Sequence, residues 1–301
     1  MRISLIAFDS LGVRSSASYI EIGALRIFID PSAALAPLRY GLPPHPRELE
    51  ELRKKLKEIE QLLEKTNVII NTHYHYDHHD PGLRLPPDIY KDKTVLVKDP
   101  NRYINFSQRK RAYRYLNLLK NHAREIMIAD SMEFRFGDTV IRFSEPIPHG
   151  HNDKLGYVIQ VLINDGEKSL LYTSDVEGPC LESQIEAILR WRPNIIILDG
   201  PSTYLAGYKY PQECVAKSIE NIRKIVALNP EFIVIDHHLV RDSNYPSIIK
   251  EVSFKNIGTA ALYMGRQENL LEANRKKLYE EEPVDGSSKQ LQDSMNGYLD
   301  E

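Results

Sequence analysis

The chain is poor in the residues that indicate several common classes of protein. Its 301 residues include only two cysteines and one tryptophan, and its formal net charge at pH 7 is −3. So few cysteines exclude a disulfide-rich scaffold and a cysteine-ligated zinc site. The near-neutral charge gives no overall attraction to nucleic acid or to a membrane surface. No apolar run approaches the roughly 20 residues that span a bilayer, so we expect a soluble cytoplasmic protein with no membrane partner.

The two cysteines, Cys180 and Cys214, have no metal-type spacing. We expect them to be reduced, buried thiols that behave as small apolar side chains, and not a disulfide.

Apolar residues are plentiful, at 42% of the chain, which is enough for a sizeable core. Strand-type runs followed by helix-type periods occur in both halves, which predicts an α/β protein of two stacked sheets with helices outside. We expect one domain over residues 1–282. The tail 283–301 has few large apolar residues, and we expect it to be poorly ordered.

Individual elements can be predicted from apolar periodicity and turn residues. A hairpin is expected over 16–30. Strands are expected at 67–71, 94–97, 132–136, 139–143, 157–163, 169–175, 194–199, 232–236 and around 260–263. Helices are expected from residue 49 to near 66, from Pro211 at the first helical position to near 229, and over 267–281.

One short stretch carries the strongest chemical signal in the chain. The expected strand at 67–71 is followed by Thr72-His73-Tyr74-His75-Tyr76-Asp77-His78-His79-Asp80. Side chains of an extended segment repeat every second residue, so His73 and His75 would point to the same side. Pro81-Gly82 supplies a turn that could return Asp77 and His78 to the same place. Imidazoles together with carboxylates are the ligands of catalytic zinc, iron or manganese, so we interpret the stretch as a metal site.

The pattern His73-x-His75-x-Asp77-His78 after a strand resembles the signature of the metallo-β-lactamase superfamily. The resemblance covers about residues 1–265, and it implies a four-layer αβ/βα sandwich with a dinuclear metal site at its edge. The run Asp236-His237-His238 and the run Gly41-Leu42-Pro43-Pro44-His45 also resemble an uncharacterised archaeal branch of this superfamily, which implies no particular substrate.

The resemblance also implies further site residues in a fixed order along the chain. Asp30 matches an aspartate that supports the metal loop, and Asp175 matches the aspartate that bridges the two ions. His149 matches a ligand, with His151 as the alternative. His237 matches the last ligand at the end of a strand, with His238 as the alternative and otherwise a supporting residue. One ion would take His73, His75 and His149, and the other would take Asp77, His78 and His237.

A pair of divalent ions lowers the pKa of a bridging water, which can then attack an electrophilic carbonyl or phosphorus. Asp77 and Asp175 are therefore candidate catalytic residues. His151, His238 or His79 could protonate the leaving group, and His151 is our first candidate. Zinc is the expected metal, with manganese or iron as alternatives because no ligand is a cysteine.

Residues 98–124 contain eight lysines and arginines with interleaved aromatic residues, a composition that suits phosphate and base contacts. We therefore consider Arg109, Lys110 and Arg111 as possible substrate-binding residues. The alternative is an ordinary solvated helix face.

Three functions follow as hypotheses. The first is a metal-dependent hydrolase of unknown substrate. The second is a nuclease or phosphodiesterase that holds RNA or DNA through residues 98–124. The third is a non-hydrolytic metal-binding module on the same fold.

Overall fold

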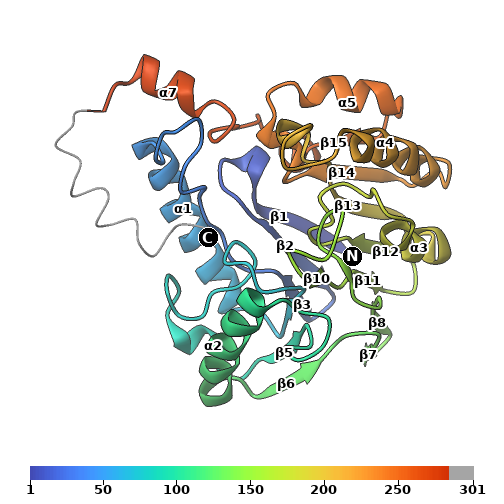
Figure 1. Cartoon of the computed structure of the whole chain (residues 1–301). Coiled ribbons are helices and arrows are strands. Elements are labelled where there is room, and N and C mark those ends of the chain that lie inside the picture. Colours follow the sequence, from blue (N-terminus) through green and yellow to red (C-terminus); the bar gives the residue numbers. More distant parts are fainter. Residues whose placement is uncertain (285–301) are drawn as a thin grey trace.

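The computed structural model describes residues 1–284 and contains two β-sheets packed face to face (Figure 1). The two helices between residues 46 and 122 cover one outer face, and the three helices between residues 182 and 252 cover the other. This arrangement confirms the four-layer αβ/βα sandwich. The expected disorder of the tail 283–301 concerns a segment that, from residue 285 on, lies outside the described residues.

The first sheet, as far as residues 1–284 show, has six strands in chain order. They are β1 (Arg2–Phe8), β2 (Ser16–Ile22), β3 (Leu25–Ile29), β4 (Val68–Asn71), β5 (Thr94–Val97) and β6 (Glu125–Ile128). The first three strands pair antiparallel, and β3 to β6 pair parallel. The carboxyl ends of β3 and β4 therefore lie side by side, with Asp30 directly after β3 and Thr72 directly after β4.

The second sheet has the order β15-β14-β13-β12-β11-β8-β7 within the described chain. Its strands are β7 (Glu133–Phe136), β8 (Thr139–Phe143), β11 (Val161–Asn164), β12 (Ser169–Tyr172), β13 (Ile195–Asp199), β14 (Phe232–Asp236) and β15 (Ile257–Gly258). Strands β12 to β15 are parallel, so their carboxyl ends also meet at one edge. A separate short ribbon pairs β9 (Ile147–Pro148) with β10 (Tyr157–Val158).

The helices follow the apolar periods of the sequence. They are α1 (Pro46–Leu63), α2 (Phe106–His122), α3 (Glu182–Trp191), α4 (Gln212–Val226), α5 (Tyr245–Val252), α6 (Ala260–Tyr263) and α7 (Arg275–Glu281). Short 3-10 turns lie at η1 (Asp9–Leu11), η2 (Pro87–Tyr90), η3 (Thr203–Leu205) and η4 (Leu239–Arg241). Helices α1 and α2 pack on the first sheet, and α3, α4 and α5 pack on the second. No helix in residues 1–284 is long and apolar enough to cross a membrane.

Strand side chains alternate between two cores, as their two-residue period requires. In β3, Ile27 and Ile29 face the second sheet, whereas Phe28 faces α1. In β4, Val68 and Ile70 face the second sheet. A strand buried on both faces has apolar residues throughout, which is why the central runs of the sequence predict strands well.

Several expected elements differ from the structure. Residues 260–263 form the helix α6 instead of a strand, because Thr259 caps the turn by accepting a hydrogen bond from Leu262 N at 3.3 Å. The helix expected over 267–281 spans only Arg275–Glu281. Pro211 is the N-cap of α4 and not its first helical residue. Strand β6 and helix α3 were not expected from the sequence.

The expectation for the cysteines was wrong. Cys180 and Cys214 form a disulfide, with Cα atoms 5.1 Å apart. It joins the segment after Asp175 to the first turn of α4, in a small apolar cluster with Tyr210. The two cysteines are 34 residues apart in sequence, and only the fold brings them within bonding distance.

Candidate metal centre

The histidine-rich loop begins where β4 ends and turns back on itself. His78 N and His79 N both donate hydrogen bonds to His75 O, at 3.0 and 3.1 Å, which closes a tight turn. Asn71, at the end of β4, donates from its amide to His78 O at 3.1 Å. The loop therefore presents the side chains before and after the turn on the same side.

The structure brings the ligand-type atoms of two groups together. His73, His75, His149 and Asp175 each offer one atom, and these atoms lie within 4.8 Å of one another. His73 Nε2 lies 3.6 Å from Asp175 Oδ2, and His149 Nε2 lies 3.5 Å from the same oxygen. His75 is partly exposed and the other three are buried. This set matches the first ligand group expected from the resemblance.

The second group shares Asp175 with the first. Asp77, His78, Asp175 and His237 also offer atoms within 4.8 Å of one another, and all four are buried. His78 Nε2 and His237 Nε2 each lie 3.1 Å from Asp175 Oδ2. Asp77 Oδ2 lies 3.6 Å from His237 Nε2. Asp175 is therefore the only residue that belongs to both four-membered groups found in residues 1–284.

Whether these ligand-type atoms fit cations can be judged from the hydrogen bonds that they make or lack. Buried polar atoms almost always have a partner, because an unpaired one costs about 1–3 kcal/mol. Several ligand-type atoms of these groups are buried and have no hydrogen-bond partner within the described residues: His73 Nε2, His78 Nε2, both ring nitrogens of His149, Asp77 Oδ1 and Asp175 Oδ1. Such a concentration of unpaired nitrogen and oxygen lone pairs in one place fits divalent metal ions.

The pKa values of two histidines in the first group and of two in the second are shifted in opposite directions. Burial lowers the pKa of His73 and His75 well below the usual value, and neighbouring histidines lower it further. Burial also opposes protonation of His78 and His237, but the adjacent Asp175 carboxylate outweighs it and raises the pKa of both histidines well above the usual value. In the metal-free protein, protons on these two rings therefore balance the buried carboxylates, at the position where cations would replace them.

Asp30 holds the metal loop from the end of β3, in the place expected for it. Its Oδ2 lies 2.9 Å from His78 Nδ1 and accepts the hydroxyl hydrogen of Tyr172 at 2.8 Å. Its Oδ1 accepts from Thr72 N at 2.8 Å. Because an ionised carboxylate only accepts, His78 carries a proton on Nδ1 and directs Nε2 toward Asp175.

Asp9 performs the same task for His237, and sequence reasoning missed it. Asp9 Oδ2 lies 2.6 Å from His237 Nδ1, which leaves Nε2 facing Asp175. Arg241 Nε donates to the other oxygen of Asp9 at 2.7 Å. An aspartate after a first strand, 228 residues from its histidine, gives no sequence signal of this contact.

The two residues considered as alternative ligands lie outside both groups. His238 is buried, and its Nδ1 lies 2.9 Å from Asp199 Oδ2. Its Nε2 lies 3.6 Å from Glu177 Oε1. His151 is partly exposed, contacts the Asn152 amide at 2.6 Å and packs edge-on against Tyr210. The geometry therefore favours His149 over His151 and His237 over His238, while a proton-transfer role for His151 stays a prediction.

The basic segment does not form one continuous surface. Arg109 and Lys110 are exposed on α2, but Arg111 is buried and lies over the Tyr76 ring at 5.0 Å. Lys98 is buried as well and pairs with Asp130 at 2.7 Å. The structure therefore does not place the three expected substrate-binding residues on one face. Arg111 lies beside the histidine loop, and the other two face solvent.

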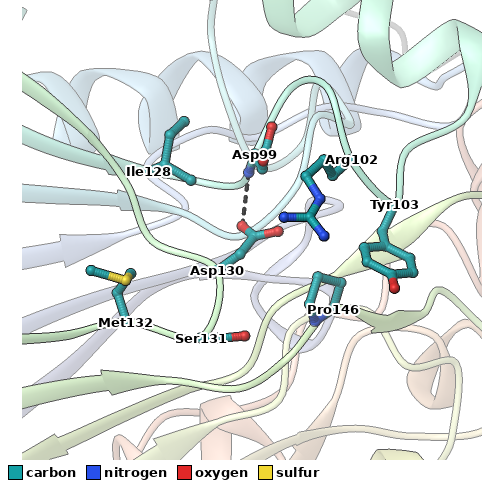
Figure 2. Close-up of a pocket in the computed structure, with 8 residues that line it drawn as sticks. All are labelled: Asp99, Arg102, Tyr103, Ile128, Asp130, Ser131, Met132 and Pro146. Atoms are coloured by element: carbon teal, nitrogen blue, oxygen red, sulfur yellow. Dashed lines mark hydrogen bonds between the residues drawn. The ribbon is translucent and has the colours of Figure 1, made fainter.

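A pocket of about 380 Å³ lies next to the ribbon that leads to His149. Figure 2 shows the Arg102 guanidinium directed into it, between Asp130 and the Tyr103 ring. Pro146, which precedes β9, forms part of its wall. Neither metal group contributes a side chain to this pocket, so it is a neighbouring feature and not the metal centre itself.

Comparison with known proteins places the chain among archaeal relatives. No family model matches the sequence. The UPF0282 protein of Korarchaeum cryptofilum is 47% identical over 293 residues, which cover 95% of this chain and 97% of that protein. The UPF0282 protein of Saccharolobus solfataricus is 45% identical over 289 residues, 94% of each chain. The expected archaeal branch is thus confirmed.

Solved structures agree on the fold. An isothiocyanate hydrolase from Delia radicum gut bacteria has a TM-score of 0.52 at 18% identity and covers 82% of this chain and 94% of that one. The metallo-β-lactamase fold protein YhfI from Bacillus subtilis has a TM-score of 0.51 at 15% identity, covering 85% and 94%. Zinc-bound PqqB from Methylobacterium extorquens has a TM-score of 0.51 at 11% identity, covering 86% and 97%. The chain therefore belongs to the UPF0282 family and has the metallo-β-lactamase fold.

Proposed function

We propose that this protein is a hydrolase that uses two divalent metal ions. The observation that carries the proposal is the shared position of Asp175, which is common to two groups of four ligand-type residues. One ion is assigned to His73, His75 and His149. The other is assigned to Asp77, His78 and His237. Asp175 has two carboxylate oxygens and can therefore contribute to both sites.

The nature of the donors narrows the choice of metal. Both groups contain only imidazole nitrogens and carboxylate oxygens. Zinc binds such sets in catalytic sites, and manganese and iron bind them too. Zinc is the proposed metal, and the relationship to zinc-bound PqqB at the level of the fold is consistent with it.

The chain's own residues set up the reaction. When bound, a pair of divalent ions lowers the pKa of water enough to supply hydroxide near neutral pH. Asp175 fixes the separation of the two groups, and Asp30 and Asp9 fix the orientation of His78 and His237. Burial of these carboxylates keeps bulk water from screening their charges. The partly exposed His75 and His151 lie on the side that solvent reaches.

The proposal is tested by metal content together with a substrate panel. The purified protein is loaded with zinc, manganese or iron, and ions per chain are counted. A chromogenic phosphodiester, a single-stranded RNA, lactones and thioesters are then offered. We expect two ions per chain and hydrolysis of one substrate class, both lost in Asp175→Asn. Asp130→Asn, which changes a partly buried aspartate outside the two groups, should keep both ions and the activity.

The outcomes separate the possible functions. RNA cleavage that is lost on replacing Arg109 and Lys110 by Ala, with lactones untouched, would identify a nuclease. Two bound ions with no turnover of any class would favour a non-hydrolytic metal-binding module. Fewer than two ions per chain under all three loading conditions would contradict the dinuclear site.

A further inference from the structure

Gln184 bonds to the backbone of two segments, one that carries His149 and one that carries Asp175. None of the hydrogen bonds found for it in residues 1–284 reaches a candidate ligand side chain. Gln184 is fully buried in the first turn of α3. Its amide nitrogen donates to Pro148 O at 3.2 Å and to Gly150 O at 2.8 Å, the carbonyls on either side of His149. The same nitrogen donates to Val176 O at 3.1 Å, next to Asp175.

Helix capping explains only one of the four hydrogen bonds found for the Gln184 side chain. Gln184 Oε1 accepts a hydrogen bond from Leu181 N at 2.8 Å, which is the contact of a capping-box residue. A glutamate would serve that contact equally well, because the contact needs only an acceptor. Donation to three backbone carbonyls requires the amide. The choice of glutamine is therefore accounted for by the loops and not by the helix.

Apart from the contact of Gln184, the backbone supports found for the loop that follows His149 act at its base and around residues 153–156. His149 N donates to Gly156 O at 2.9 Å, which closes the base of the loop 149–156. On the opposite side, Gln108 donates to Leu155 O at 2.7 Å and accepts from Tyr74 N at 3.3 Å. Both ring nitrogens of His149 lack a hydrogen-bond partner within residues 1–284. The position of this ring therefore depends on its backbone, and Gln184 holds that backbone on both sides.

We propose that Gln184 is a positioning residue for the ion held by His73, His75 and His149. By joining residues 148, 150 and 176 through one amide, it sets the distance between His149 and Asp175, whose nearest ligand-type atoms are 3.5 Å apart. This inference rests on the proposed dinuclear function. The other members of the second group come from the histidine loop and from the end of β14, so that group shares only Asp175 with the backbone that Gln184 holds, and we expect it to be affected less.

Two substitutions at this position separate positioning from folding. Gln184→Glu keeps the size of the side chain and the cap, but places an acceptor against three carbonyl oxygens. Gln184→Met removes the donors without adding charge. The matched control is Asn221→Asp, because Asn221 is equally buried and donates from α4 to Pro179 O at 2.7 Å, at the far end of the same segment.

The measurement is Zn²⁺ affinity of the full-length protein, by competition with a chromophoric chelator, together with the melting temperature of the metal-free form. We expect both Gln184 variants to weaken one of the two sites by about 10- to 100-fold, as substitutions behind metal ligands do, and to leave the other site within about threefold of wild type. Asn221→Asp should lower the metal-free melting temperature comparably and leave both affinities unchanged.

Two results would overturn the inference. One is wild-type affinity at both sites in Gln184→Glu and Gln184→Met. The other is an equal loss at both sites in all three variants, which would show a general effect on folding. Failure of the proposed function gives a different pattern, since the wild-type protein itself would then bind fewer than two zinc ions.

Discussion

At the scale of single residues, the candidate metal centre is supported by side chains that are not themselves candidate ligands. Asp9 is the clearest case, because it lies between Arg241 and His237 and bonds to both. A carboxylate in this position fixes the proton of the ring on Nδ1 and increases the basicity of Nε2. Such partners are commonly as important to affinity as the ligands themselves.

Replacing Asp9 by Asn should weaken the binding of the ion assigned to His237. The amide can still accept from Arg241 through its oxygen, but its NH₂ group then faces the Nδ1–H of His237, donor against donor. We expect about 10- to 100-fold lower affinity for one zinc ion, measured by chelator competition. The site that contains His149 should be nearly unaffected, the reverse of the pattern expected for Gln184→Glu.

Asp242→Asn provides the control, since Asp242 follows the same turn η4 and the contacts found for its side chain are to Thr203 Oγ1 and Asn244 N. It should bind both ions like wild type. Unchanged zinc affinity in Asp9→Asn would show that the contact with His237 is not needed to orient the ring.

Sequence reasoning could predict only part of this site. His73, His75, Asp77 and His78 lie in one loop, and their spacing alone predicts a metal site. More distant residues such as His149 were expected only through the resemblance to a known family. Asp9 and Gln184 could not be found, because their role consists of contacts with residues far away along the chain or with backbone carbonyls, neither of which has a sequence pattern.

At the scale of elements, the segment around Glu272 and Arg275 is joined by ion pairs to the N-terminal part of the chain. Arg14 and Glu272 form a bidentate ion pair, in which Nε donates to Oε2 at 2.7 Å and Nη2 donates to Oε1 at 2.8 Å. Arg275 and Glu48, both fully buried, form another. Since Arg14 lies five residues after Asp9, the segment around Glu272 also stabilises the turn that supports His237.

Replacing Glu272 by Gln should destabilise the protein and change its acid sensitivity. Burial acts against ionisation of Glu272, but Arg14 outweighs it and lowers the pKa well below the usual 4.5. A lowered pKa stabilises the folded state at pH values above about 4.5, and this contribution is lost as the pH falls below that value. Glu272→Gln should therefore cost about 1–3 kcal/mol near neutral pH, because the neutral side chain no longer offers a carboxylate to Arg14 in this partly buried pair.

The check is urea unfolding between pH 7 and pH 3 for both proteins. The free-energy difference between wild type and Glu272→Gln should narrow as the pH falls below about 4.5. Glu281→Gln, which changes an exposed glutamate of α7 paired only with Lys277 among the described residues, should behave like wild type. A difference that stays constant with pH would show that the carboxylate charge is not the source of the stabilisation.

Elements were predicted well where periodicity was long and poorly where it was short. The run 232–236 is apolar and ends in an acid, and it forms strand β14. The four residues 260–263 also look like a strand, but so short an apolar run carries no period, and the cap at Thr259 decides for a helix. The Cys180–Cys214 disulfide lay beyond prediction, because spacing in sequence does not report proximity in space.

At the scale of the whole molecule, both sheets direct the carboxyl ends of their parallel strands to the same edge of the sandwich. The first sheet contributes Asp30 and the histidine loop, and the second contributes Asp175 and His237. The two groups of ligand-type residues therefore join halves of the chain that also meet through an apolar core and through hydrogen bonds such as that of Tyr172 to Asp30. Ions bound there would connect the two sheets.

Metal removal should consequently lower the stability of the whole fold. A ligand that binds only the native state at 100 times its Kd adds about 2.7 kcal/mol per site. For a chain of this size each kcal/mol corresponds to about 2–4 °C in Tm. Calorimetry with and without a chelator should therefore show a fall of roughly 10 °C or more when both sites are emptied. Asp175→Asn should show a much smaller shift, because it disrupts both sites at once. An equal Tm with and without chelator in wild type would mean that the unpaired buried donors are tolerated without ions, and that apolar packing and direct hydrogen bonds such as that of Tyr172 to Asp30 hold the two sheets together.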